Sequence, residues 1–320
     1  MFRKILKWTG IILLFIIIGV IAVTAFRQNR TFAAPYPEIH ASKDSMTIAR
    51  GKYLVFSSAH CADCHAPDGT DDLVNAGKEV PLQGGRLFDL PIGKVYSRNI
   101  TSDSSGIGKY TDREIARALR FGVDPEGHAL FDFMPFHNTS DSDLTAIISY
   151  LRTLAPVKNE VPSHQLNPLG KLVNAFLIEP VGPTGAVPSY VKPDTTIEYG
   201  SYIANSVANC GGCHTNRDLM TGAYIGKSYA GGFKMESITD PKHFSCVTPN
   251  LTPDPETGHI YGWSRTVFMD RMRAGKRIPH SAMPWGPFSR MGDTELVSIY
   301  KYLQTLTPVK QKNGEILVKN

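Results

Sequence analysis

The sequence predicts an all-α protein in which two tandem copies of one helical domain follow a single N-terminal transmembrane helix. A long apolar run near the N-terminus indicates the transmembrane helix. An internal repeat covers nearly all of the remaining chain, and its length is that of a domain rather than of a solenoid unit. Apolar residues recur at helical spacing within each copy, as from Leu144 to Leu154, and this periodicity indicates the fold class.

The N-terminal apolar run extends from Trp8 to Phe26 and follows three basic residues. A helix of this length is just enough to cross a hydrocarbon core of about 30 Å. A cleaved signal peptide is the alternative, because Val23-Thr24-Ala25 resembles a cleavage site. The apolar core of a signal peptide is usually only about 7–15 residues long, so we expect residues 1–29 to remain as an anchor. Basic residues before the run slightly outnumber those just after it, which favours a cytoplasmic N-terminus.

Matched residues in two halves of the chain define the domain organisation. In the first helix, matched residues are 149 positions apart. The first copy has Thr47, Ile48, Gly51 and Tyr53, and the second copy has Thr196, Ile197, Gly200 and Tyr202. Insertions shift this offset further along, yet Met134-Pro135 and Met283-Pro284 again stand 149 positions apart. We therefore expect six segments: the anchor, a tether (30–44), a first domain (45–157), a proline-rich crossover linker (158–194), a second domain (195–310) and a polar tail (311–320).

Three helices are expected in each copy. The first covers 47–60 and 196–209, where glycine at matched positions favours close helix packing despite its cost of about 1 kcal/mol in a helix interior. Thr111 and Ser264 are good N-caps for the second helix. The last helix carries one apolar face in each copy, which we interpret as core and expect to pack across the first helix at or near its glycine. A short amphipathic segment, Leu169–Ile178, interrupts the crossover linker.

One pentapeptide pattern occurs in both copies, as Cys61-Ala62-Asp63-Cys64-His65 and Cys210-Gly211-Gly212-Cys213-His214. Two thiols separated by two residues and followed by histidine are the attachment signature of c-type haem. We expect Cys61, Cys64, Cys210 and Cys213 to form thioethers with two haem c groups. The histidines would then each ligate an iron from one side. Zinc is an alternative use of paired cysteines, but a four-cysteine site would need the two pairs to converge across a domain boundary. A thioredoxin-like redox pair is another alternative, but no βαβ pattern surrounds either motif.

Two methionines are the predicted second axial ligands. Met134 follows His65 by 69 residues, and Met283 follows His214 by the same distance. Both precede proline, whereas the rival candidates His128, His137, His280 and Met291 are not matched between the copies. Histidine–methionine ligation raises the haem potential and closes the iron to substrates, so the pattern is typical of one-electron transfer.

Several remaining residues have weaker interpretations. Tyr110 and Trp263 align and are candidates for contact with haem propionates, although packing is the more common role of aromatic residues. Asn99 and Asn250 either cap turns or line the haem. Cys246, the fifth cysteine, aligns with an apolar residue and is expected to be a buried, inert thiol. The formal charge of +5 implies no partner, because two haems would bring propionates worth about −4, and we expect no nucleic-acid partner.

Two runs of the first copy, NITSDSSGIGKYTDREIARALRFGV (99–123) and FMPFHNTSDSDLTAIISYLRTLAPV (133–157), carry a family resemblance. They resemble the cytochrome c subunits of membrane-bound bacterial alcohol, gluconate and sorbitol dehydrogenases, as do TPNLTPDPETGHIYGW and SAMPWGPFSRMGDTELVSIYKYLQTLTPV in the second copy. The resemblance covers about 45–310. It implies cytochrome c domains attached to haem outside the cytoplasm, on the periplasmic face of a bacterial inner membrane. Those subunits usually carry three haem domains and a C-terminal anchor, whereas this chain has two and an N-terminal anchor.

The expected function is therefore electron transfer by a membrane-anchored dihaem cytochrome c, not enzymatic catalysis. Its expected partners are redox proteins: a periplasmic dehydrogenase or other donor, and a respiratory oxidase or other acceptor. The alternative is a dihaem peroxidase or related oxidase with one haem open to substrate, and two matched methionines disfavour it. A haem-based sensor would need an output domain, and residues 311–320 are too short to form one.

Overall fold

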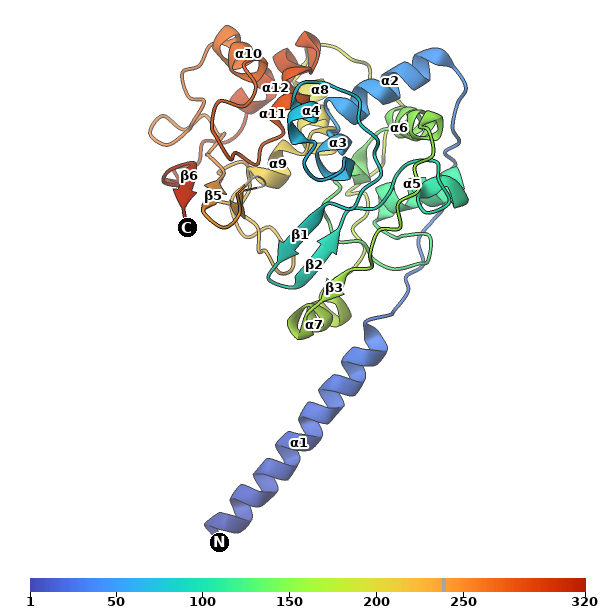
Figure 1. Cartoon of the computed structure of the whole chain (residues 1–320). Coiled ribbons are helices and arrows are strands. Elements are labelled where there is room, and N and C mark those ends of the chain that lie inside the picture. Colours follow the sequence, from blue (N-terminus) through green and yellow to red (C-terminus); the bar gives the residue numbers. More distant parts are fainter. Residues whose placement is uncertain (238–239) are drawn as a thin grey trace.

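The computed structural model describes residues 1–237 and 240–320, in which a long N-terminal helix leads into a head built from all later elements (Figure 1). Helix α1 (Phe2–Arg27) projects from the head, and its side chains are exposed almost throughout. It is the one helix among the described residues that is long and apolar enough to cross a membrane, a test that a signal sequence also passes.

The first half of the head contains six α-helices and three strands. In chain order its elements are α2 (Ser45–Phe56), α3 (Cys61–His65), α4 (Asp71–Asn75), β1 (Leu87–Leu90), β2 (Gly93–Tyr96), the 3₁₀ helix η1 (Ile107–Lys109), α5 (Asp112–Phe121), the 3₁₀ helix η2 (Phe136–Asn138), α6 (Asp141–Thr153), β3 (Gln165–Leu166) and α7 (Pro168–Phe176).

The second half repeats much of this order. Its described elements are α8 (Ile197–Tyr202), the π-helix η3 (Ile203–Val207), α9 (Cys210–Cys213), β4 (Lys234–Glu236), β5 (Phe244–Val247), α10 (Arg265–Arg273), α11 (Trp285–Ser289), α12 (Asp293–Gln304) and β6 (Leu317–Lys319).

The matched glycines lie where α2 crosses α6 and where α8 crosses α12. A Cβ atom at Gly51 would lie 1.9 Å from the carbonyl oxygen of Ala146, and one at Gly200 would lie 1.9 Å from that of Ser298. Only glycine lets the backbones approach so closely, so the predicted packing of α2 on α6 and of α8 on α12 is confirmed. The apolar faces of α6 and α12 are buried as predicted, and Leu144 and Leu296 are completely inaccessible.

The prediction of an all-α fold is wrong. Each half contains a three-stranded antiparallel sheet, with strand orders β1-β2-β3 and β4-β5-β6. The strands are only two to four residues long, so they are too short to show a strand period in the sequence. The third strand of each sheet comes from after the last helix, and the segment 311–320 therefore ends in a strand rather than being only a polar tail.

The first helix of each half also ends earlier than predicted. Before each pentapeptide, a residue with left-handed backbone, His60 (φ 40°) or Asn209 (φ 54°), separates that helix from the short helix of the motif. In the second half the helix also widens into the π-helix η3. By contrast, Thr111 and Ser264 cap α5 and α10 as predicted, since each hydroxyl accepts a hydrogen bond from a backbone N–H of the first turn.

The segment 30–44 lies against the head instead of forming a free tether. Phe32 N donates to the carbonyl of Gly127, and Ala41 N donates to Asp112 Oδ2 at 2.7 Å. Ile39 is buried, and Tyr36 lies under the guanidinium of Arg117. This segment has no helical or strand periodicity in its sequence, yet it is not a free linker. Its single residues contact separate sites on the first domain.

Candidate functional site

The four motif cysteines occupy equivalent places on two short helices, α3 and α9. All four are free thiols and half-buried, so none is engaged in a disulfide. Burial raises the pKa of Cys61, Cys64 and Cys210 to about 12, and the neighbouring Cys213 contributes to the increase at Cys64. Cys61 and Cys210 both pack against one continuous apolar core, although 144 residues separate the two motifs in the sequence.

Both motif histidines are held by a backbone carbonyl. Nδ1 of His65 lies 2.7 Å from the oxygen of Arg98, and Nδ1 of His214 lies 3.0 Å from that of Pro249. A carbonyl can only accept, so Nδ1 carries the ring proton and Nε2 keeps a lone pair for a metal. Burial lowers the pKa of His214 to about 4, which also favours the neutral ring. Two free thiols and one oriented neutral imidazole are the donor set that a c-type haem requires, so the residues fit the group.

The role of the Arg98 and Pro249 carbonyls was not predicted, although the residues that follow them recur in both copies. Arg98 and Pro249 directly precede Asn99 and Asn250, which were matched between the copies. In the structure Asn99 Nδ2 donates to the carbonyl of Val157, and its Oδ1 accepts from Thr101 N. Asn250 repeats these bonds with Val309 and Thr252. The asparagines thus shape the loop that carries the histidine-orienting carbonyl.

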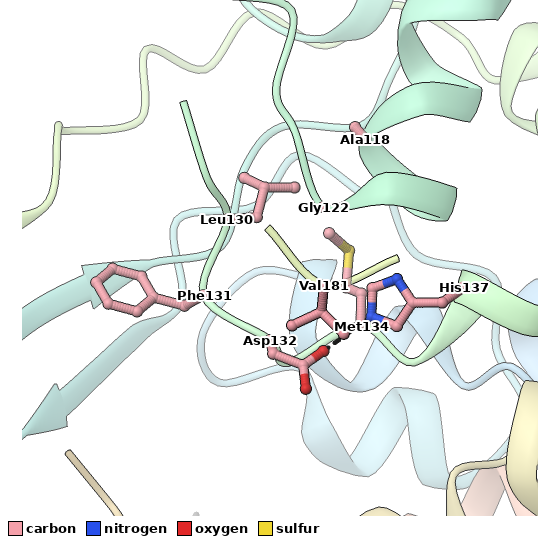
Figure 2. Close-up of a pocket in the computed structure, with 8 residues that line it drawn as sticks. All are labelled: Ala118, Gly122, Leu130, Phe131, Asp132, Met134, His137 and Val181. Atoms are coloured by element: carbon pink, nitrogen blue, oxygen red, sulfur yellow. Dashed lines mark hydrogen bonds and ion pairs between the residues drawn. The ribbon is translucent and has the colours of Figure 1, made fainter. Parts of the chain in front are cut away.

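Met134 lies in a small pocket beside His137, and its sulfur points towards the side of Gly122 (Figure 2). Met283 is partly buried against the main core. Each Met-Pro pair is followed by a short helix, η2 or α11, which precedes α6 or α12. Their pairing with His65 and His214 stays a prediction.

The rival ligands have other roles in the structure. His137 uses both ring nitrogens, since Nε2 lies 2.9 Å from Asp132 Oδ1 and Nδ1 lies 3.2 Å from the carbonyl of Arg120. His280 stacks on Phe244 with ring centroids 4.5 Å apart. Met291 is 1% exposed and belongs to the core, and His128 lies 3.4 Å from Asp124 on the surface.

Tyr110, Trp263 and Cys246 each contact other residues of the protein. The hydroxyl of Tyr110 donates to Glu126 at 2.7 Å, and Trp263 contacts His259 while its carbonyl accepts from Tyr300. Their predicted contact with haem propionates stays a prediction. Cys246 is buried as expected, and its thiol donates to the carbonyl of His280 at 3.2 Å.

Each methionine segment packs against the haem-motif region of the other half. Thr139 Oγ1, after Met134, donates to the carbonyl of Ser206 at 2.6 Å, and Asp132 pairs with Arg217 at 3.0 Å. In the reverse direction, Ser57 Oγ donates to the carbonyl of Pro287 at 3.3 Å.

The ring of His60 packs edge-on against that of Phe288 in this second segment, with ring centroids 5.2 Å apart. The contact between the halves is therefore reciprocal. It brings the two attachment motifs together at one junction.

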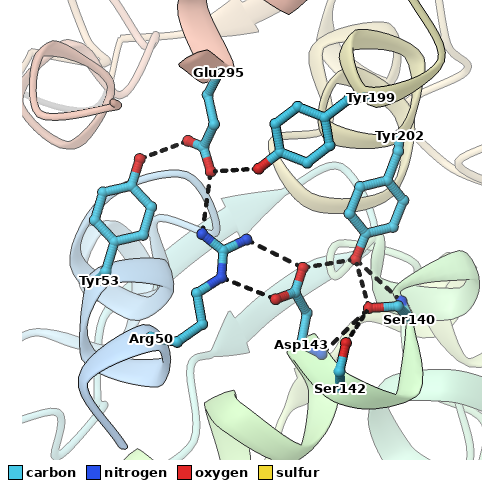
Figure 3. Close-up of polar contacts among 8 residues, drawn as sticks. All are labelled: Arg50, Tyr53, Ser140, Ser142, Asp143, Tyr199, Tyr202 and Glu295. Atoms are coloured by element: carbon cyan, nitrogen blue, oxygen red, sulfur yellow. Dashed lines mark hydrogen bonds and ion pairs between the residues drawn. The ribbon is translucent and has the colours of Figure 1, made fainter. Parts of the chain in front are cut away.

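A buried charged cluster completes this junction (Figure 3). Arg50 of α2 bonds Asp143 of α6 at 2.9 Å and Glu295 of α12 at 3.4 Å. Tyr53 donates to Glu295 at 2.6 Å, and Tyr202 of α8 donates to Asp143 at 2.8 Å. One cation between two carboxylates thus links four helices from both halves.

The alternative uses of the cysteines gain no support. Within residues 1–237 and 240–320, no three His, Cys, Asp or Glu side chains are grouped to hold a metal ion by themselves. A redox-active thiol pair needs a lowered pKa on its nucleophile, whereas burial raises the pKa of these thiols.

Comparison with known proteins gives a family match and several relatives. Residues 48–155 match the family model described as Cytochrome c. The chain is 29% identical over 304 residues to the fructose dehydrogenase cytochrome subunit of Gluconobacter japonicus, covering 88% of this chain and 57% of that protein. It is 30% identical over 305 residues to the cytochrome c subunit of the quinone alcohol dehydrogenase of Gluconobacter oxydans, covering 87% and 59%. The chain thus spans less than two thirds of the length of these dehydrogenase subunits.

A shorter relative is covered more completely. The chain is 27% identical over 225 residues to a diheme cytochrome c-type protein of Cereibacter sphaeroides, covering 68% of this chain and 71% of that protein.

Proposed function

We propose that the whole chain is a dihaem electron relay rather than a catalytic subunit, starting from the match of residues 48–155 to the Cytochrome c family model. The observation that supports it most is the matched donor set, two thiols and one carbonyl-oriented imidazole, present once in each half. The relatives named as cytochrome subunits of dehydrogenases and as a diheme cytochrome support the same function.

In this proposal two haem c groups are held by Cys61, Cys64, Cys210 and Cys213, with axial ligation by His65, Met134, His214 and Met283. A bound haem supplies reversible one-electron oxidation and reduction. The protein orients each imidazole through the carbonyls of Arg98 and Pro249, which also raises the basicity of Nε2. The reciprocal packing of the two halves holds the flanks of both motifs at one junction.

We further propose that α1 remains as a membrane anchor and that the head faces the periplasm. The length and exposure of α1 support the anchor. The donor would be a periplasmic dehydrogenase, by analogy with the named relatives, and the acceptor would belong to the respiratory chain. Because the segment 30–44 is bound to the head, the head cannot move far from the membrane. This favours a subunit held in a fixed place over a carrier that moves between partners on a flexible linker.

The experiment is haem stoichiometry and ligand-set spectroscopy on the full chain, produced in a host that attaches c-type haem. We expect two haems per chain, and one haem in the Cys61→Ala/Cys64→Ala and Cys210→Ala/Cys213→Ala variants. Cys246→Ala is the control and should keep two. Both ferric haems should be low-spin and show the far-red charge-transfer band of methionine ligation.

A single haem in the unaltered protein would refute the dihaem proposal. One high-spin or bis-histidine haem would refute the simple relay and favour a peroxidase-type enzyme.

A further inference from the structure

Helix α7 lies directly at the head-side end of α1 (Figure 1). Arg27 Nε donates to the carbonyl of Ala175 at 3.1 Å, and the Arg27 guanidinium lies 5.2 Å from the ring of Phe176. Asn174 donates to the carbonyl of Gln28 at 3.0 Å. The apolar run of α1 ends at Phe26, so a membrane crossed by α1 has its boundary at the level of α7.

One face of α7 is fully used by the head. Val173 and Ile178 pack with Ile92 of the β1–β2 turn, and Gly170 approaches the Ile92 backbone so closely that a Cβ atom would lie 1.9 Å from its carbonyl oxygen. Ala175 is completely buried. These contacts hold the helix firmly and determine which of its side chains point outwards.

The outward side chains of α7 and of its C-cap are apolar as well. The exposed fractions are 47% for Leu169, 40% for Leu172, 40% for Phe176 and 57% for Leu177. Leu169, Leu172 and Phe176 follow the spacing of one helical face, and the only charged residue of the helix is Lys171. A helix that is apolar on both sides needs a second apolar environment besides the head.

We propose that this second environment is the outer leaflet of the membrane. Helix α7 lies flat in the headgroup layer, and Leu169, Leu172, Phe176 and Leu177 insert among the upper acyl chains. The continuity of this patch with the end of the transmembrane helix identifies the occupant as lipid, since the patch begins where the bilayer ends. Lys171 reaches the headgroups, as basic residues of interfacial helices do. The inference rests on the proposed membrane anchor.

This second contact changes what the anchor does. One transmembrane helix alone lets a head rotate and tilt, whereas α1 and α7 together attach the head to the membrane at two points. The sheet β1-β2-β3, which packs on α7, then faces the membrane, and α10 and α12 face away from it (Figure 1). A redox partner would meet the head in one fixed orientation.

The test is photo-crosslinking to lipid by the full-length haem-loaded protein in vesicles of phosphatidylcholine and phosphatidylglycerol. p-Benzoylphenylalanine replaces Leu172 or Leu177 in the patch, Ile16 in α1 as the anchor control, or Val267 in α10 as the matched control. Val267 is 48% exposed, and the helix that carries it, α10, lies at the opposite end of the head from α7 (Figure 1). Two patch positions are used so that a misfolded variant, recognised by loss of its haem spectrum, does not decide the result.

We expect lipid adducts at positions 16, 172 and 177, with a yield several-fold above that at position 267. Adducts at position 16 with background yield at positions 172 and 177 would refute the proposal that α7 lies in the membrane interface. The proposal that α1 is a membrane anchor would still hold. Background yield at position 16 would overturn the anchor itself. Irradiation of intact cell membranes adds one further outcome: a protein adduct in place of lipid at 172 and 177 would show that a partner subunit covers α7 and would overturn the proposal.

Discussion

Removal of Arg50 tests the junction between the two halves most directly. In Arg50→Ala the carboxylates of Asp143 and Glu295 lose their shared cation, and their side chains are only 9% and 4% exposed. Removing one partner of a buried ion pair typically costs about 3–5 kcal/mol, because the remaining charge is left uncompensated. The hydroxyls of Tyr53 and Tyr202 still donate to these carboxylates, so we expect the lower end, about 3 kcal/mol.

Thermal unfolding of the haem-loaded protein, followed by circular dichroism, measures this loss. One kcal/mol lowers the Tm by about 2–8 °C across domains of 60 to 250 residues, so about 3 kcal/mol corresponds to a decrease of about 6–24 °C. Lys52→Ala, on the same helix, is the matched control, because Lys52 pairs with Glu79 at 2.5 Å on the surface. An exposed pair of this kind contributes at most about 1 kcal/mol.

The loss should also depend on pH. Burial raises the pKa of Glu295 above its ordinary value. A raised pKa in the folded state stabilises the fold at low pH, and this contribution disappears as the pH rises through the folded pKa. Without Arg50 that pKa rises further, so the deficit of the variant should be smallest near pH 4.5 and should grow towards neutral pH.

Two results would refute the argument. The first is a decrease in Tm in Arg50→Ala no larger than in Lys52→Ala. The second is failure of Arg50→Met/Asp143→Asn/Glu295→Gln, which removes the buried charges together, to recover most of the lost stability.

Further predictions concern packing, ligation and the fifth thiol. Gly200→Ala places a Cβ atom 1.9 Å from a carbonyl oxygen of α12 and should lower the Tm strongly, whereas Gly185→Ala meets nothing within 4 Å and should leave the Tm unchanged; equal Tm values would contradict the close packing. Met283→His should lower the midpoint potential of one haem and remove its far-red band in redox titration, while Met291→Leu in the core should change neither. Cys246→Val should keep two haems and a Tm close to the original, because the thiol makes one weak hydrogen bond; a lost haem on mass spectrometry would contradict an inert role.

Parts of the fold followed from sequence because they depend on short or repeated spacing. The helical stripe of α6 and the recurrence of Gly51 and Gly200 predicted which surfaces pack, and both predictions hold. The sheets were missed, since a pair such as β2 with β3 is formed by segments far apart that carry no period of their own. The contacts of the segment 30–44 were not predicted for the same reason. Ile39 is buried by residues of α5 and α6, which lie far from it in the sequence.

The sequence by itself determined where a haem can be attached. Thiols and imidazole stand next to one another along the chain, so Cys61-Ala62-Asp63-Cys64-His65 and its twin predict the donor set without any fold. Only the tertiary structure decided how the imidazoles are oriented, how the two motifs meet and which face of the head lies at the end of α1. Those features depend on contacts between distant residues, such as Arg50 with Glu295 across 245 positions, and burial makes such contacts specific by excluding water from them.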